Sequence, residues 1–154
     1  MNTVVLGLDG TEASRSAVRW CAANLEPGCT VVAVCGIRNF GELVMSIPPF
    51  DGAVIERKIA DRLRRDWCLP LFQAGLHCRT HLVHRAQADA VLEEASSIHA
   101  DAVVVGVELH HGIGAAFRRA GLDKVIQRAP CPVMLVPTNR PATTLAPLNS
   151  SVVA

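Results

Sequence analysis

The stretch VVVGVELHHGIGAAFRRAGLDKVIQRAPCPVMLVP, residues 103–137, decides the fold class. It opens with an apolar run, passes through a glycine-bearing loop and then enters a helix. It closes with a second short apolar run, residues 131–137, that prolines bracket. The first run is typical of a buried strand, and the prolines favour a strand at or near the rim of a sheet. A strand, a helix and a further strand in this order predict a parallel sheet with right-handed crossovers.

The same alternation runs back to the N-terminus. Apolar runs at residues 3–9, 30–37 and 100–107 predict strands that are covered on both faces. Residues 77–84, HCRTHLVH, alternate and carry polar side chains, which is typical of an edge strand. With the strand at 131–137, we predict an α/β fold with a five-stranded parallel sheet and helices on both faces.

Apolar residues at helical spacing mark the helices between these strands. Thr11 can cap a helix whose apolar face ends near Leu25. Between Ile55 and Trp67 an apolar residue recurs every fourth position, which predicts an amphipathic helix that Pro70 disturbs. The next helical pattern lies at residues 88–98.

Composition indicates one globular domain. The chain has 154 residues, of which 50% are hydrophobic and 19% charged, so it can bury a sizeable core. Its formal net charge of +1 gives no electrostatic case for nucleic acid, and no segment reaches the roughly 18 apolar residues of a membrane span. The six cysteines form no C-x-x-C pair and there is no leader-like segment, so we expect reduced thiols and a cytoplasmic location. We place the domain at residues 1–138 and expect residues 139–154 to form a mobile tail.

Two segments at predicted strand ends are candidates for ligand binding. They are GLDGT, residues 7–11, and GVELHHGIG, residues 106–114. Ligands of open α/β sheets bind beyond the carboxyl ends of the strands, where the strand order reverses. If the strands before these segments are neighbours, both segments face one crevice. Residues 38–52 form a long loop with apolar side chains, which could cover this crevice as a lid or hang free.

Three motifs resemble the universal stress protein family. They are VVLGLDGTEASRSAVRWCAANL from residue 4, HRAQADAVLEEASSIHADAVVVG from residue 84, and RAPCPVMLVP from residue 128. The resemblance covers residues 3–137 and implies a sheet of order 3-2-1-4-5 in a cytoplasmic protein. It also implies a homodimer, in which the edge strand Val133–Val136 pairs with its copy across a two-fold axis. The family has an ATP-binding branch and a branch that does not bind ATP.

The resemblance also implies a phosphate-binding loop, which this chain matches only in part. The ATP-binding branch carries G-x2-G-x9-G-[ST] after the fourth strand, and here these positions are Gly106, Leu109, Arg119 and Ala120. A Cβ atom at Leu109 or Arg119 would crowd a phosphate that is held by the backbone, and Ala120 lacks the hydroxyl. Arginine side chains at a helix start could instead hold phosphate by charge.

The adenosine end of the implied site is better preserved. Asp9 matches the family aspartate at the end of the first strand, and Cys35 and Gly36 fall where the second strand offers backbone groups to adenine. An alternative for Asp9 is turn formation or helix capping in LDGTE. The candidate binding residues are Gly7, Asp9, Gly10, Thr11, Cys35, Gly36, Gly106, Leu109, Gly112, Arg119, Ala120 and Gly121.

Sequence motifs for catalysis are absent. The chain has no G-x-S-x-G elbow, Walker motif or S-x-x-K, and His110 and His111 have no recognised metal-ligand spacing. We predict no metal and no catalytic residue. The favoured hypothesis is a non-enzymatic homodimeric stress-response module with a degenerate ATP loop. The alternative is a switch that binds ATP, AMP or cyclic AMP, and a slow nucleotide hydrolase comes third.

Overall fold

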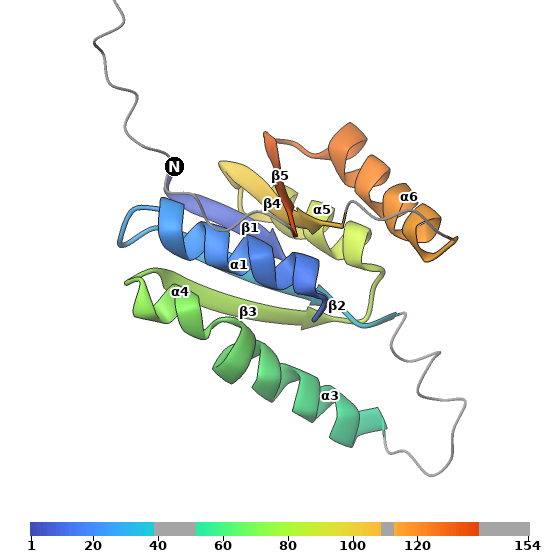
Figure 1. Cartoon of the computed structure of the whole chain (residues 1–154), viewed down its shortest axis with the longest axis horizontal. Coiled ribbons are helices and arrows are strands. Elements are labelled where there is room, and N and C mark those ends of the chain that lie inside the picture. Colours follow the sequence, from blue (N-terminus) through green and yellow to red (C-terminus); the bar gives the residue numbers. More distant parts are fainter. Residues whose placement is uncertain (39–51, 109–112, 139–154) are drawn as a thin grey trace, which may run out of the picture.

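The strands form one five-stranded parallel sheet of order β3-β2-β1-β4-β5 (Figure 1). The computed structural model describes residues 1–38, 52–108 and 113–138, with the helical backbone alone for residues 113–119. Both the predicted sheet and the order implied by the resemblance are confirmed. The strands are β1 (Thr3–Gly7), β2 (Thr30–Gly36), β3 (His77–Val83), β4 (Ala102–Val107) and β5 (Val133–Pro137).

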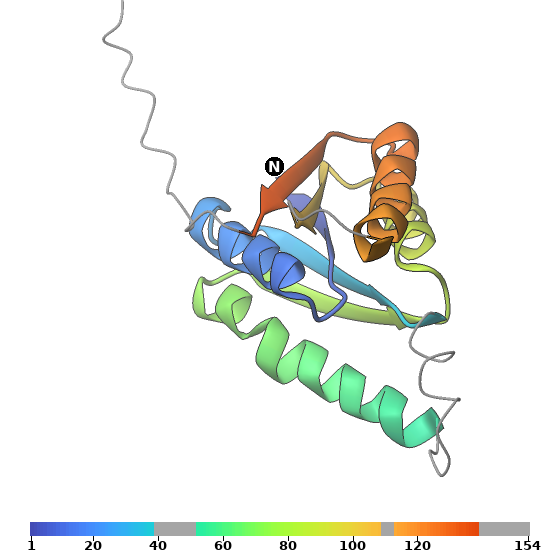
Figure 2. The same ribbon diagram turned by 45° about the vertical axis from the view of Figure 1, so that its right-hand side comes forward.

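Helices cover both faces of this sheet. The helical elements are α1 (Glu12–Asn24), α3 (Gly52–Arg62), the π-helical turn η1 (Leu63–Trp67), α4 (Leu69–Gln73), α5 (Gln87–Ser97) and α6 (Ile113–Arg128). Figures 1 and 2 show α1 and α4 on one face, and α5 and α6 on the other.

The central strand β1 supplies both hydrophobic cores. Leu6 packs toward α1, where it joins Val18 in one buried cluster. Its neighbour Val5 points to the other face and joins Val91 of α5. All three strands at the centre of the sheet have apolar residues on both faces, because helices remove both faces from water.

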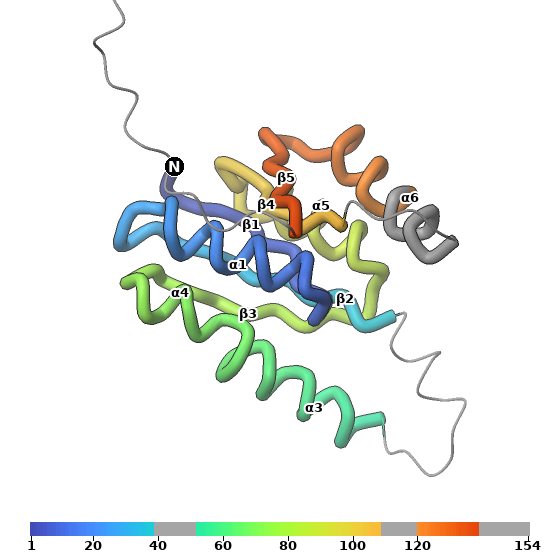
Figure 3. Tube along the Cα trace, viewed as in Figure 1, coloured from blue at the N-terminus to red at the C-terminus, as the bar shows by residue number. Residues whose placement is uncertain are grey.

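The helix predicted between Ile55 and Trp67 is interrupted. The α-helical part, α3, ends at Arg62, and η1 follows as a wider turn in which Cys68 N donates to Leu63 O at 3.1 Å. Pro70 does not end this helix but lies in the first turn of α4, where a missing N–H costs nothing. Figure 3 shows the trace running from α3 into α4, and α3 itself has no buried residue.

The two edges of the sheet differ. β3 alternates between exposed and partly buried residues, as predicted for an edge strand. At the opposite edge, β5 buries Val136 but leaves Leu135 42% exposed. No helix among the described residues is long and apolar enough to cross a membrane. Nearly all of the loop 38–52, and the tail 139–154, lie outside the described residues.

Candidate functional site

Asp9 organises the turn between β1 and α1. Its Oδ1 atom accepts hydrogen bonds from Thr11 N at 3.0 Å and from Thr11 Oγ1 at 2.6 Å. Thr11 Oγ1 in turn accepts from Ser14 N at 3.2 Å, so Thr11 is the predicted N-cap of α1. The turn-forming alternative for Asp9 is therefore confirmed, while contact with a nucleoside stays a prediction.

Gly10 is required by the packing of the same turn. Its φ is +81°, which favours glycine, and a Cβ atom would lie 2.8 Å from the indole ring of Trp67. The β1–α1 turn thus rests on η1. This contact accounts for Gly10 without a ligand.

Gly106, at the end of β4, lets α1 approach the sheet. A Cβ atom on Gly106 would lie 1.9 Å from the carbonyl oxygen of Ala13 and 2.7 Å from Ser14 N. No side chain fits in that space. The one family motif position that this chain retains therefore has a packing role of its own.

The end of β2 is closed by a residue that the sequence did not indicate. Gly36 N donates to Gln87 Oε1 at 2.6 Å, and Gln87 Nε2 donates to Val34 O at 2.9 Å. Gly7 belongs to the same contact, since a Cβ atom there would lie 3.3 Å from Gln87 Nε2. The side chain of Gln87, the first residue of α5, thus lies against the carboxyl ends of both β1 and β2. A polar side chain at the start of the helix predicted over 88–98 was the only signal that could have identified it.

Cys35 lies between the two residues that bind Gln87 and faces the other side of β2. Its side chain is fully buried in the core under α1. Burial, with a smaller effect from the charge of Asp9, raises the pKa of the Cys35 thiol to about 12. The thiol therefore stays protonated at neutral pH, which makes it a poor nucleophile.

The predicted residues gather on two faces of the sheet. Gly7 and Gly36 meet at Gln87 on the α5 face, whereas Gly10 and Gly106 pack on the α1 face. The ends of β1, β2 and β4 are neighbours, as the family resemblance implied, but side chains and backbone of the protein itself approach Gly7, Gly36 and Gly106 closely.

Part of the implied phosphate loop lies outside the described residues. This holds for Leu109 and Gly112, and also for His110 and His111. The backbone of Arg119 is helical, Ala120 is exposed on α6, and Gly121 faces Ala88 of α5, whose Cβ lies 3.9 Å from the position of an added Cβ. In the described part, no three His, Cys, Asp or Glu side chains lie close enough together to hold a metal.

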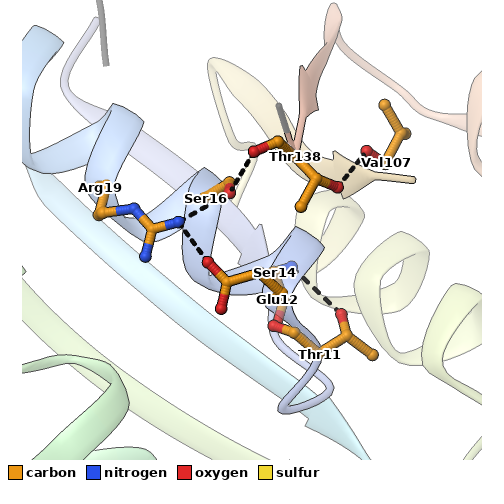
Figure 4. Close-up of polar contacts among 7 residues, drawn as sticks. All are labelled: Thr11, Glu12, Ser14, Ser16, Arg19, Val107 and Thr138. Atoms are coloured by element: carbon orange, nitrogen blue, oxygen red, sulfur yellow. Dashed lines mark hydrogen bonds and ion pairs between the residues drawn. The ribbon is translucent and has the colours of Figure 1, made fainter. Parts of the chain in front are cut away.

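Polar contacts tie the end of β5 to the region where β4 and α1 meet (Figure 4). Thr138 Oγ1 and Thr138 N each donate to Val107 O at 3.0 Å. Ser16 Oγ donates to Thr138 O at 3.5 Å, and Arg19 Nη2 reaches both Ser16 Oγ at 2.9 Å and Glu12 at 2.6 Å. The guanidinium group of Arg19 lowers the pKa of Glu12. These contacts fix α1 against the strand ends that frame the site.

A groove of about 430 Å³ lies beside the Asp9 turn, between α1 and η1. Arg15, Arg19 and Arg62 line it together with the single carboxylate of Asp66 and the ring of Trp67. Three arginines thus face one carboxylate in the lining, and Arg19 is already paired with Glu12.

Comparison with known proteins identifies the family. A model of the universal stress protein family matches residues 1–137, while no curated protein sequence matches. The solved structure of hypothetical protein MJ0577 has a TM-score of 0.67 and 15% identity, over 92% of this chain and 98% of that one. A family protein from Arabidopsis thaliana with AMP bound has a TM-score of 0.61 and 13% identity, over 89% and 92%. A universal stress protein in complex with cAMP has a TM-score of 0.59 and 20% identity, over 89% and 97%.

These structures share the fold, and the family model spans all five strands. The chain therefore belongs to the universal stress protein family.

Proposed function

We propose that this chain is a non-enzymatic, homodimeric regulatory member of its family in which ordinary ATP binding is weak or absent. The observation that carries the proposal is the set of residues at the phosphate-loop positions, where Leu109, Arg119 and Ala120 stand in place of two glycines and a hydroxyl residue. The hydrogen bond from Gly36 N to Gln87 supports it, because this N–H is already satisfied without a ligand.

The exposed edge of β5 supports the dimer. Leu135 is 42% exposed on a strand that has no neighbour on its outer side among the described residues. Apolar edge strands of this kind are normally covered, and a two-fold contact between two copies covers both at once. In the proposed dimer, Val133–Val136 pairs with the same strand of a second copy.

A second candidate function is an adenine-nucleotide switch. It is favoured by the relatives that were solved with AMP and with cAMP. The Gly36 N–H and Val34 C=O groups, which bind an amide here, also form a donor and acceptor pair that suits an adenine edge.

Titration calorimetry with ATP, AMP and cAMP tests the two candidates. We expect ATP to bind the wild type no more tightly than millimolar, and the triple variant Leu109→Gly, Arg119→Gly, Ala120→Ser to gain at least about tenfold in affinity. GTP serves as the control ligand, and circular dichroism checks that the variant is folded. Micromolar binding of ATP by the wild type would contradict weak triphosphate binding, and phosphate release above the buffer rate would contradict a non-enzymatic role.

A further inference from the structure

The side chain of Gln87 continues the hydrogen-bond ladder between β1 and β2. The last backbone bond of this ladder runs from Leu8 N to Val34 O at 2.9 Å. Beyond it, where β1 has turned away, Gln87 Nε2 donates to the same carbonyl at 2.9 Å and Gln87 Oε1 accepts from Gly36 N at 2.6 Å. The carboxamide therefore supplies the acceptor for Gly36 N that a continued β1 strand would have offered.

Two glycines make room for this side chain. A Cβ atom on Gly36 would lie 2.6 Å from Arg85 O and 2.8 Å from Gln87 N, and one on Gly7 would lie 3.3 Å from Gln87 Nε2. Gly36 is therefore required for this close approach of α5, and Gly7 eases it. The orientation of the amide is also determined, because one partner is a donor and the other an acceptor.

A carboxamide and a 6-aminopurine present the same hydrogen-bonding pattern. Each has an NH₂ donor next to an acceptor, which in adenine are the N6 amino group and N1. The Gly36 N–H and Val34 C=O groups could bind either, but not both at the same time. The amide of Gln87 thus presents to Gly36 N–H and Val34 C=O the same donor and acceptor as the N6–N1 edge of adenine.

We propose that Gln87 is an internal competitor for the adenine-binding position at the end of β2, which it closes in the free protein and vacates when a 6-aminopurine nucleotide binds. The inference rests on the second candidate function, adenine-nucleotide binding. Competition of this kind lowers the apparent affinity by the fraction of molecules in which the position is open. Because two hydrogen bonds of ordinary net strength hold Gln87 in place, we expect a reduction of about tenfold.

The test is AMP titration of the wild type and of two variants, Gln87→Ala and Gln87→Met. Alanine removes the side chain, while methionine keeps its length and removes both hydrogen bonds. Each should bind AMP about tenfold more tightly than the wild type. The matched control, Gln127→Ala on the exposed side of α6, should leave the affinity unchanged. Inosine monophosphate should gain nothing, because its O6 and N1–H present acceptor and donor in reversed order.

Nuclear magnetic resonance of the Gly36 amide supplies a readout without ligand. Exchange of this proton with solvent should be slow in the wild type and faster in both Gln87 variants, and equal rates would overturn the proposed closure. If the wild type binds AMP and the variants bind no better, the competitor role is wrong while nucleotide binding stands. If no form binds AMP at millimolar concentration, the inference and the second candidate function fail together.

Discussion

Asp9 shows that a residue can match a family site and still be engaged by its own turn. Both hydrogen bonds to its Oδ1 atom come from Thr11, which caps α1. A carboxylate in this position stabilises the start of the helix whether or not a nucleoside is present. Stability and ligand affinity must therefore be measured separately for any change at this residue.

Replacing Asp9 by alanine should lower the free energy of unfolding of the ligand-free protein by about 0.5–2 kcal/mol. The loss arises because Thr11 N and Thr11 Oγ1 lose their acceptor. Urea denaturation measures it, and Asp9→Asn is the matched control because it keeps an acceptor oxygen. A loss well above 2 kcal/mol would show that Asp9 supports more of the fold than this turn.

Gly106 should tolerate no side chain. In Gly106→Ala the new Cβ atom would meet the backbone of α1 at Ala13, so we expect a loss of at least about 3 kcal/mol in the free energy of unfolding. The control is Gly52→Ala at the first residue of α3, since no atom lies within 4 Å of a Cβ built there. Equal stability of the two variants in urea would contradict the close approach of α1.

Among the elements, β5 has two sides with different roles. Met134 packs against the core under α1, whereas Leu135 is exposed. A charge at position 134 should therefore act on the fold, and one at position 135 on assembly.

We expect Leu135→Lys to weaken the proposed dimer by at least about 100-fold without lowering the melting temperature of the monomer, because the two-fold axis repeats the change in both copies. Met134→Lys should instead lower the melting temperature. Sedimentation over a range of concentrations measures the first effect, with Val54→Lys on the exposed part of α3 as the control. A wild type that is monomeric at micromolar concentration would contradict the dimer.

The elements themselves could be predicted from sequence to different extents. Apolar runs sufficed for β1, β2 and β4, because both faces of these strands are buried. The strand order came from the family resemblance, since periodicity does not encode which strands are neighbours. Apolar spacing also could not reveal η1, because a recurrence at every fourth residue fits an α-helical turn and a wider π-helical turn alike. Gln87 escaped notice because its contacts join residues that are 51 and 53 positions apart.

At the scale of the whole molecule, the hydrogen bonds of Thr138 fasten the end of β5 to the rest of the fold. They join the last described residue to Val107 and to Ser16 of α1. The domain boundary at residue 138 stays a prediction, because residues 139–154 lie outside the described residues.

A chain that ends after Thr138 should unfold at the same temperature as the full chain. One that ends after Leu135 should lose about 2–4 kcal/mol, because the buried side chain of Val136 and the bonds of Thr138 disappear. Calorimetry of the two truncated forms and the full chain decides the point. A clear drop in stability on removal of residues 139–154 alone would place part of the tail in the domain.

The close approach of α1 to Gly106 has a consequence for how such chains change over evolutionary time. A glycine that the fold requires is retained even in a chain that does not bind a ligand, because selection for a stable protein preserves it. Ala120 is exposed on α6, so folding does not constrain this position. Substitutions can therefore accumulate there in a chain that does not need a nucleotide. The presence of the first motif glycine in a sequence is thus weak evidence for a nucleotide. The hydroxyl residue at the end of the motif is the more informative position when members of this family are sorted by function.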